Sequence, residues 1–213
     1  MSTISKNIVT IQNSKEYNRI AHVYFNRKYT NSGNSYDIDL KTYIKPGYFI
    51  LDFGCGPGNN FNFLLSCKPK LLVGVDISQK MLDYANLDVK NNSVIKLIRS
   101  SFEEFKINIK FDFILAHLSF VHVQPENLDT ILIKCFGLLN GDRYFFANYF
   151  EGNDEIKIME SEWDNEKEVK RYFCFLKKQT LERAYKKAHF EIKKIFLSEG
   201  KSFNRINIIA KKP

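Results

Sequence analysis

Short apolar runs of strand length alternate with segments of helical periodicity along most of this chain. The expected strands are an apolar stretch that begins at residue 48, followed by residues 71–76, 94–99, 111–116 and 143–148. Helices are expected over 59–66, 78–86 and after Pro125, where apolar residues recur at helical spacing. Strands separated by helices pair in parallel through right-handed crossovers. The pattern therefore predicts an α/β fold.

The two ends of the chain depart from this alternation. Residues 1–45 are polar, with a helix expected over 14–26 and then a loop rich in Ser, Asn and Gly, and this segment is predicted to be a cap or lid. Residues 191–198 and 203–210 flank a short turn and are predicted to form an antiparallel hairpin. We expect one domain, with the cap over 1–45, the core over 46–213 and a substrate-side insertion over 149–176.

A glycine-rich turn follows the first strand. The segment YFILDFGCGPGNN contains an acid, Asp52, and then Gly54, Gly56 and Gly58. Glycines let the backbone approach a ligand closely, and the N–H groups of a following helix point at that ligand. The second strand, LLVGVD, also ends in an acid, Asp76, which is placed to accept hydrogen bonds from ribose hydroxyls. Together these features predict a site for an adenosine-containing cofactor.

The spacing of the glycines distinguishes between cofactors. The nicotinamide and flavin fingerprint G-x-G-x-x-G requires glycine where this chain has Asn59. The G-x-G-x-G turn after an acid-tipped strand instead resembles motif I of the class I S-adenosylmethionine-dependent methyltransferases, and Asp76 matches the ribose-binding acid of that family. The segments FDFILAHLSFVHV, FGLLNGDRYFFANYF and AYKKAHFEIKKIF resemble its fourth strand, its turn into strand five and its C-terminal helix and strand. The resemblance covers roughly residues 40–213.

This resemblance implies a fold. The expected architecture is a Rossmann-like sheet of seven mostly parallel strands in the order 3-2-1-4-5-7-6, with helices on both faces. An antiparallel C-terminal hairpin and an N-terminal helical cap complete it.

The resemblance also implies the cofactor, S-adenosylmethionine, with S-adenosylhomocysteine as its product. The glycines would place backbone N–H groups beside the methionine portion, while Asp52 lies under the turn within reach of the ammonium. Asp76 would hold the ribose, and Ile77 would pack on the adenine. After strand three the family often has an acid for the adenine amino group, but this chain has Ser101, followed by Phe102. The expected cofactor residues are Asp52, Gly54, Cys55, Gly56, Gly58, Asp76, Ile77, Met81, Ser101, Phe102 and Ala116.

Two histidines follow the fourth strand, where the family lines its reaction centre. Methyl transfer needs an acceptor held in line with the methyl group and able to lose or lack a proton. His117 and His122 are the candidate bases, because a neutral imidazole takes up a proton near pH 7. The alternative for His122 is that it orders the start of a helix.

Aromatic side chains of the cap and the insertion are the expected substrate contacts, because such rings shape apolar pockets and stabilise a sulfonium. Ordinary core packing is the alternative for each ring. The expected substrate-binding residues are Tyr17, Tyr24, His117, Tyr149, Phe150, Trp163 and Tyr172.

The net charge of +8 is distributed unevenly. Residues 177–213 hold eleven Lys or Arg against three acids, whereas residues 151–168 hold eight acids against two lysines. A basic C-terminal face can attract RNA, membrane phosphates or an acidic substrate. However, the basic residues after Thr180 lie outside the apolar stripe of their helix, which is typical of a solvated face. The acidic segment around Trp163 suggests a cationic or amine substrate as one hypothesis.

The resemblance favours an enzyme that methylates O, N or C of a small metabolite beneath the cap. The N/D-P-P-Y/F motif of base and glutamine methyltransferases is absent after strand four, where the sequence is AHLSFVHV. Two alternatives stay open: an RNA or protein methyltransferase that uses the basic C-terminal face, and an inactive S-adenosylmethionine-binding protein. We expect a small-molecule substrate, no nucleic acid or membrane partner, and a monomer or homodimer.

Composition agrees with a single globular domain. With 213 residues, of which 44% are apolar, the chain can build one core. It has no apolar run of bilayer length and no hydrophobic stretch of a signal peptide at its start, so we expect a cytoplasmic protein. The four cysteines, Cys55, Cys67, Cys135 and Cys174, lack C-x-x-C spacing and histidine partners, so neither disulfides nor a metal are expected.

Overall fold

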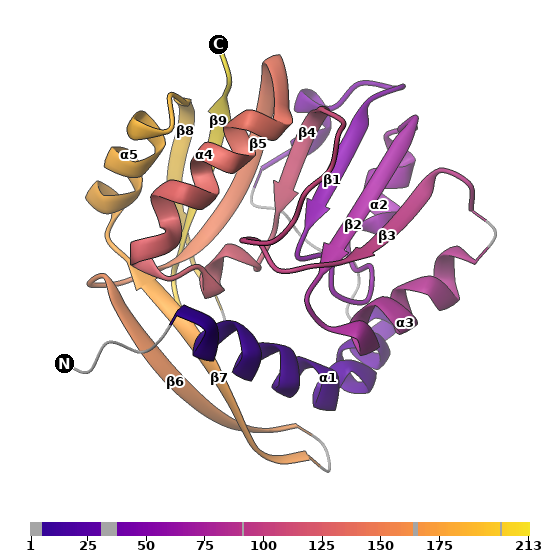
Figure 1. The fold of residues 1–213 in the computed structure, drawn as a ribbon, viewed down its shortest axis with the longest axis vertical. Coiled ribbons are helices and arrows are strands. Elements are labelled where there is room, and N and C mark those ends of the chain that lie inside the picture. Colours follow the sequence, from indigo (N-terminus) through magenta and orange to yellow (C-terminus); the bar gives the residue numbers. More distant parts are fainter. Residues whose placement is uncertain (1–5, 31–37, 91, 164–165, 201) are drawn as a thin grey trace.

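One β-sheet with helices on both faces forms the body of the molecule (Figure 1). The computed structural model describes residues 6–30, 38–90, 92–163, 166–200 and 202–213. The strands are β1 (Phe49–Phe53), β2 (Leu71–Asp76), β3 (Ile95–Arg99), β4 (Phe111–Ala116), β5 (Leu139–Glu151), β6 (Glu155–Trp163), β7 (Glu166–Leu176), β8 (Glu191–Ser198) and β9 (Arg205–Lys211). The α-helices are α1 (Lys6–Thr30), α2 (Phe61–Ser66), α3 (Gln79–Val89), α4 (Leu128–Leu138) and α5 (Lys178–Lys187), and three short 3-10 turns are η1 (Leu40–Tyr43), η2 (Phe120–His122) and η3 (Pro125–Asn127).

The central strands pair as predicted. β1 lies between β2 and β4, all parallel, so that Asp52 pairs with Gly74 on one side and Leu115 on the other. At the far side, β9 runs antiparallel to β5, and β8 runs antiparallel to β9. Counting β9 and β8 as the last two strands reproduces the expected order 3-2-1-4-5-7-6 and confirms the Rossmann-like α/β class.

The predicted number of strands was too small. The insertion over 149–176 was expected without strands of its own, but it forms the antiparallel hairpin β6–β7, which gives a sheet of nine strands in the part of the chain that the structure describes. Ile156 and Ile158 alternate with charged residues in β6, but Ile158 is exposed, so this alternation does not mark a buried face. The apolar run over 172–176 at the end of β7 was instead taken as part of an insertion that supplies aromatic substrate contacts, so the strands of the insertion were not recognised.

The hairpin joins the sheet at the tip of β5. Phe150 pairs with Arg205 of β9 on one side and with Phe175 of β7 on the other, whereas β4 already ends opposite Ala147. Because a strand residue has only two neighbouring strands, β7 occupies the side of β5 that β4 has left. The hairpin therefore extends the sheet beyond the carboxyl end of β4.

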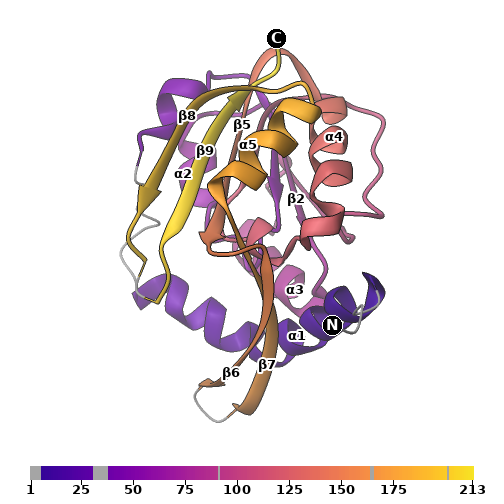
Figure 2. The ribbon, with the colours of Figure 1, turned by 90° about the vertical axis from the view of Figure 1, so that its left-hand side faces the viewer.

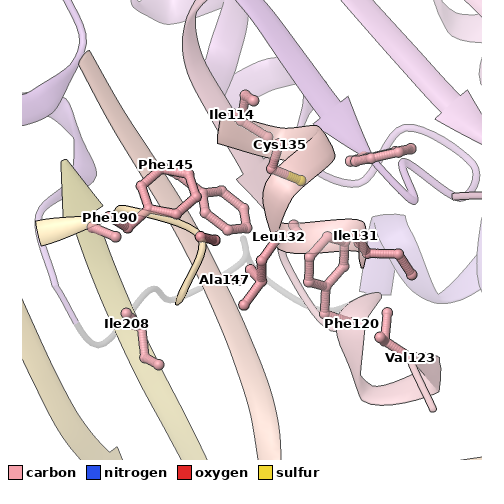
Figure 3. Close-up of a cluster of buried hydrophobic side chains, with 14 of the residues drawn as sticks. Ile114, Phe120, Val123, Ile131, Leu132, Cys135, Phe145, Ala147, Phe190 and Ile208 are labelled. Carbon is pink, nitrogen blue, oxygen red and sulfur yellow. The ribbon is translucent and has the colours of Figure 1, made fainter. Parts of the chain in front are cut away.

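Alternating side chains bury both faces of the sheet. On one face, a large cluster lies beneath α4 and α5 and includes Phe120, Leu132 and Phe145 (Figure 3). On the other face, Ile50, Phe113 and other side chains pack against α2, α3 and η1. Burial on both faces explains why the central strands read as continuous apolar runs in the sequence.

The first helix crosses the carboxyl ends of the parallel strands (Figures 1 and 2). It contacts α3 and β7. Polar bonds tie it to the end of β2: Ser14 Oγ donates to Ile77 O at 3.2 Å, and Asn18 Oδ1 accepts from Ser78 Oγ at 2.9 Å and from Lys80 N at 3.0 Å. The helix is longer than the predicted span of 14–26, and part of the predicted loop, 31–37, lies outside the described residues.

All four cysteines are buried. Among the residues that the structure describes, no group of three or more His, Cys, Asp or Glu side chains is arranged to hold a metal ion. No helix in the described part of the chain is long and apolar enough to cross a membrane.

Candidate active site

A cavity of about 190 Å³ opens where the turn after β1 meets the ends of β2 and β4. The turn is fixed to β2, because Gly54 N and Cys55 N both donate to Val75 O, at 2.8 and 2.9 Å. α1 forms the opposite wall with Val9, Thr10, Asn13, Tyr17 and Tyr24. The cavity thus lies between the glycine turn and the first helix.

The three glycines of the turn have different roles. All have positive φ, at +86°, +54° and +82° for Gly54, Gly56 and Gly58, a region that favours glycine. A Cβ atom on Gly54 would lie 2.2 Å from Ser119 Cβ, and one on Gly58 would lie 2.6 Å from the Phe61 ring. A Cβ atom on Gly56 would meet no atom within 4 Å. Gly54 and Gly58 are therefore required by packing, whereas Gly56 faces the open cavity.

Asp76 stands at the tip of β2 and lines the cavity. Its Oδ2 accepts from Gly56 N at 2.9 Å, and its Oδ1 accepts from Ser78 N at 2.8 Å. Burial raises the pKa of the Asp76 carboxyl to about 6, although these backbone hydrogen bonds oppose the shift. A carboxylate offers about four lone-pair positions, so it can accept further hydrogen bonds from a ligand.

Asp52 lies deeper than the cavity wall. It is completely buried, and both of its oxygens accept from Asn60 Nδ2 at 3.1 Å. Burial raises the pKa of Asp52 to about 7, the Asn60 hydrogen bond lowers it, and the charge of Asp76 raises it. Asn60 is one of the described residues that line the cavity, whereas Asp52 is not. Asp52 therefore orients Asn60 instead of facing the cavity itself.

Two asparagines are cavity residues that sequence reasoning missed. Asn59 and Asn60 both line the cavity, and Asn59 Oδ1 is buried without a hydrogen-bond partner among the described residues. A buried acceptor without a partner is costly unless a ligand or water supplies a donor. The sequence signal for these residues was the pair of asparagines directly after Gly58. Sequence reasoning used Asn59 only to exclude the dinucleotide-binding fingerprint.

The other predicted cofactor residues divide into two groups. Ile77, Met81, Ser101 and Phe102 line the same cavity, together with Gly54, Cys55 and Gly56. Ser101 Oγ accepts from Glu104 N at 3.1 Å and so orders the turn after β3. Two expected residues, Gly58 and Ala116, are not among the lining residues, because Gly58 packs on Phe61 and Ala116 is fully buried in β4.

Only some of the predicted substrate residues line the cavity. Tyr17, Tyr24 and His117 line the cavity. Tyr149 is fully buried, where its hydroxyl bonds that of Tyr185 at 2.9 Å, and Phe150 packs against Phe173 and Phe203. Tyr149 therefore lies in the core, Phe150 is half-buried in a smaller cluster with Phe173, and neither residue lines the cavity.

The remaining two substrate candidates lie in the hairpin. The Trp163 backbone pairs with Glu166, and its side chain lies outside what the structure describes. Tyr172 acts through its main chain: its N–H donates to Asn13 Oδ1 at 2.8 Å, and its carbonyl accepts from Asn13 Nδ2 at 3.0 Å. Asn13 thus locks α1 onto β7.

His122 is held by two hydrogen bonds. Its Nδ1 lies 2.7 Å from Tyr172 O, which can only accept, so Nδ1 carries the proton. Nε2 then accepts from Tyr17 Oη at 2.7 Å. Burial lowers the pKa of His122 to about 4, the Tyr172 carbonyl raises it, and the charge of Arg171 lowers it. A neutral imidazole with both nitrogens engaged fits the alternative in which His122 orders its segment.

His117 occupies a different environment. It follows the last residue of β4, lines the cavity, and its ring centroid lies 6.4 Å from that of Phe146. Leu118 beside it has a positive φ of 52° and donates its N–H to the buried Asn148 Oδ1 at 2.7 Å. This contact turns the chain sharply after β4 and aims the segment 117–119 at the cavity.

The strand order, the glycine turn and the acid-tipped second strand define the class I methyltransferase fold. Residues 50–142 match a family model described as "Methyltransferase domain". Over these residues, which are less than half of the chain, the sequence is similar to this family of methyltransferases.

Solved structures share this fold. An S-adenosylmethionine-dependent methyltransferase from Methanosarcina mazei superimposes with a TM-score of 0.71 at 17% identity, over 84% of this chain and 98% of that one. The 1,6-didemethyltoxoflavin-N1-methyltransferase of Burkholderia thailandensis, with bound 1,6-didemethyltoxoflavin and S-adenosylhomocysteine, gives 0.71 at 16% identity, over 100% and 91%.

Among curated proteins, the chain is 33% identical over 90 residues to the cyclopropane-fatty-acyl-phospholipid synthase of Escherichia coli K12, which is 42% of this chain and 23% of that protein. The chain spans less than half the length of each of the curated relatives it matches.

The cavity fits the cofactor of this family, S-adenosylmethionine. The open space in front of Gly56 accommodates a ligand close to the backbone, and the Asp76 carboxylate can accept from ribose hydroxyls. Asn59 Oδ1 is a buried acceptor that an ammonium can satisfy. These three features stand on one wall, so the residues present match the chemical groups that the cofactor carries.

Proposed function

We propose that this protein transfers a methyl group from S-adenosylmethionine to O, N or C of a small molecule. The observation that carries the proposal is the cavity itself, in which the open Gly56 backbone and the Asp76 carboxylate face α1 across a small space. A volume of about 190 Å³ between the turn and a helix is suited to small ligands.

The chain would hold the cofactor from the turn side and the acceptor from the helix side. Asp76 and the residues after it bind the ribose and adenine, while Asn59 and the main chain near Gly56 bind the amino-acid portion. The cofactor supplies an electrophilic methyl group on a sulfonium. α1 and the segment after β4 exclude water and hold the acceptor in line. His117 is the residue placed to take a proton from an acceptor that needs to lose one.

Binding and labelling test this proposal. Calorimetry should show that the protein binds both S-adenosylmethionine and S-adenosylhomocysteine. Asp76→Ala should weaken both by about 1.5 to 3 kcal/mol for each lost charge-assisted hydrogen bond. Unchanged affinity would contradict the ribose assignment.

Transfer is then measured with methyl-labelled cofactor in a cell extract, where we expect label in the small acid-soluble fraction. Label only in RNA or protein would favour the polymer alternative. Cofactor binding without any transfer would favour an inactive binding protein. Asp76→Ala serves as the control for background labelling.

A further inference from the structure

Arg171 places a positive charge behind the acceptor side of the cavity. It lies in β7 and is 6% exposed. Its Nη1 donates to Tyr24 Oη at 2.9 Å, and its guanidinium carbon lies 5.5 Å from the centroid of the Tyr17 ring. Tyr17 and Tyr24 both line the cavity, so the guanidinium is separated from the cavity by one layer of rings.

The charge of Arg171 acts on the cavity wall. At Tyr17, burial raises the pKa of the phenol well above its ordinary value, and the Arg171 charge acts in the opposite direction, toward phenolate. At His122, where burial already lowers the pKa, the same charge disfavours the imidazolium further. Both effects have the sign expected of a cation that stabilises negative charge and opposes positive charge at this wall.

The hydroxyl of Tyr24 transmits this preference. Tyr24 Oη accepts a hydrogen bond from the guanidinium, and the Tyr24 hydroxyl is in turn hydrogen-bonded to that of Tyr17. The charge therefore polarises a chain of two hydroxyls that belong to the cavity wall.

Two acidic residues of the hairpin are paired with lysines at its surface. Glu155 pairs with Lys157 at 2.9 Å, and Glu160 pairs with Lys170 at 3.7 Å. All four side chains are exposed, so solvent and salt screen them. The acidic segment that suggested an amine substrate is, at these positions, a solvated surface.

We propose that the methyl acceptor is a small organic anion, carrying a carboxylate or an ionised phenolic oxygen, and that Arg171 is the specificity-determining residue that selects it. Arg171 acts through Tyr17 and Tyr24, which form the wall, so it is a positioning and charge-supplying residue. The inference rests on the proposed function, because it assigns a substrate class to the same site.

Three probes of closely similar size test the inference on the whole 213-residue chain loaded with S-adenosylhomocysteine. Benzoate, benzamide and benzylamine differ mainly in charge, and calorimetry near neutral pH at low ionic strength measures each affinity. We expect benzoate to bind at least about tenfold more tightly than benzamide, because a nearby cation favours the anion, and benzylamine to bind most weakly. Arg171→Met should reduce the preference for benzoate to within about twofold, whereas Arg171→Lys should retain part of it.

A matched control separates local charge from net charge. Arg143→Met also removes one cation, but Arg143 pairs with Asp112 at 3.0 Å and does not line the cavity, so the preference for benzoate should persist. If Arg171→Met does not fold, the inference is tested by the order of the three affinities in the wild-type protein and in Arg171→Lys.

Several outcomes would overturn the inference. They are benzylamine binding as tightly as benzoate, no saturable benzoate binding in the millimolar range, and an Arg171→Met variant that keeps the full preference. Failure of the wild-type protein to bind S-adenosylhomocysteine would instead refute the proposed function, so the two failures are distinguishable.

Discussion

Replacing Gly56 by Ala tests the central feature of the cavity. The new methyl group would meet no protein atom within 4 Å, so it would project into the space assigned to the cofactor. The Gly56 N–H that donates to Asp76 is retained in alanine, and the bond itself should persist. The substitution therefore blocks the cavity while leaving the surrounding hydrogen bonds in place.

Gly56→Ala is expected to lower both the stability of the fold and the affinity for S-adenosylhomocysteine. A substitution at a second glycine separates these two effects. A residue with a side chain at φ +54° pays about 1 to 2 kcal/mol of folding free energy for the left-handed conformation. Gly47 has φ +85° and equally open surroundings, but it lies in the turn before β1 and not at the cavity. Gly47→Ala should thus lose a similar amount of stability. Only Gly56→Ala should also lose affinity for S-adenosylhomocysteine, by at least about tenfold, which corresponds to about 1.4 kcal/mol.

Urea unfolding monitored by circular dichroism measures the loss of stability, and calorimetry with S-adenosylhomocysteine measures the loss of affinity. Equal affinities in the two variants would show that the space in front of Gly56 is not where the ligand lies. A loss of affinity in Gly47→Ala as large as that in Gly56→Ala would show that general destabilisation is responsible.

Two further predictions follow from the burial of Asp76 and of Phe120. With a pKa of about 6, Asp76 is ionised above neutral pH and gains a proton as the pH falls through 6, so S-adenosylhomocysteine should bind about tenfold more weakly one pH unit below that value. Asp76→Asn should flatten this dependence, and a flat wild-type profile in calorimetry would contradict it. Phe120 is fully buried against Phe53 and Phe145, so Phe120→Ala should lower the free energy of unfolding by about 3 to 5 kcal/mol. The exposed Ile158→Ala should change it by no more than about 0.5 kcal/mol, and equal losses in urea unfolding would refute the assigned packing.

Local patterns were sufficient to predict the central sheet. The expected strands 71–76, 111–116 and 191–198 coincide with β2, β4 and β8, because each sits between clear breaks in the sequence. The hairpin β6–β7 was missed because charged residues interrupt most of its length and the apolar end of β7, residues 172–176, was taken for substrate contacts. α1 extends beyond its predicted ends, where Ile8 and Ile11 are exposed and give no amphipathic pattern.

The cofactor half and the acceptor half of the site also differ in how well the sequence predicts them. Most residues of the cofactor half belong to two short motifs, at 52–60 and 76–81, so their chemistry could be predicted from spacing. The acceptor half joins α1 to β7, and its contacts link Asn13 with Tyr172 and Tyr24 with Arg171. Pairs separated by about 150 positions leave no local signal, and the importance of Arg171 emerges only from the folded arrangement.

This division has an evolutionary consequence. Because β7 attaches to the tip of β5 beyond the end of β4, the hairpin can change in sequence and length without altering the register of the parallel strands. Natural variation in the chemistry of the acceptor should therefore accumulate in the first helix and the hairpin as a matched pair. A chimera that exchanges both segments together should inherit the donor's selectivity, whereas exchanging either one alone should leave mismatched partners and a poorly formed acceptor wall.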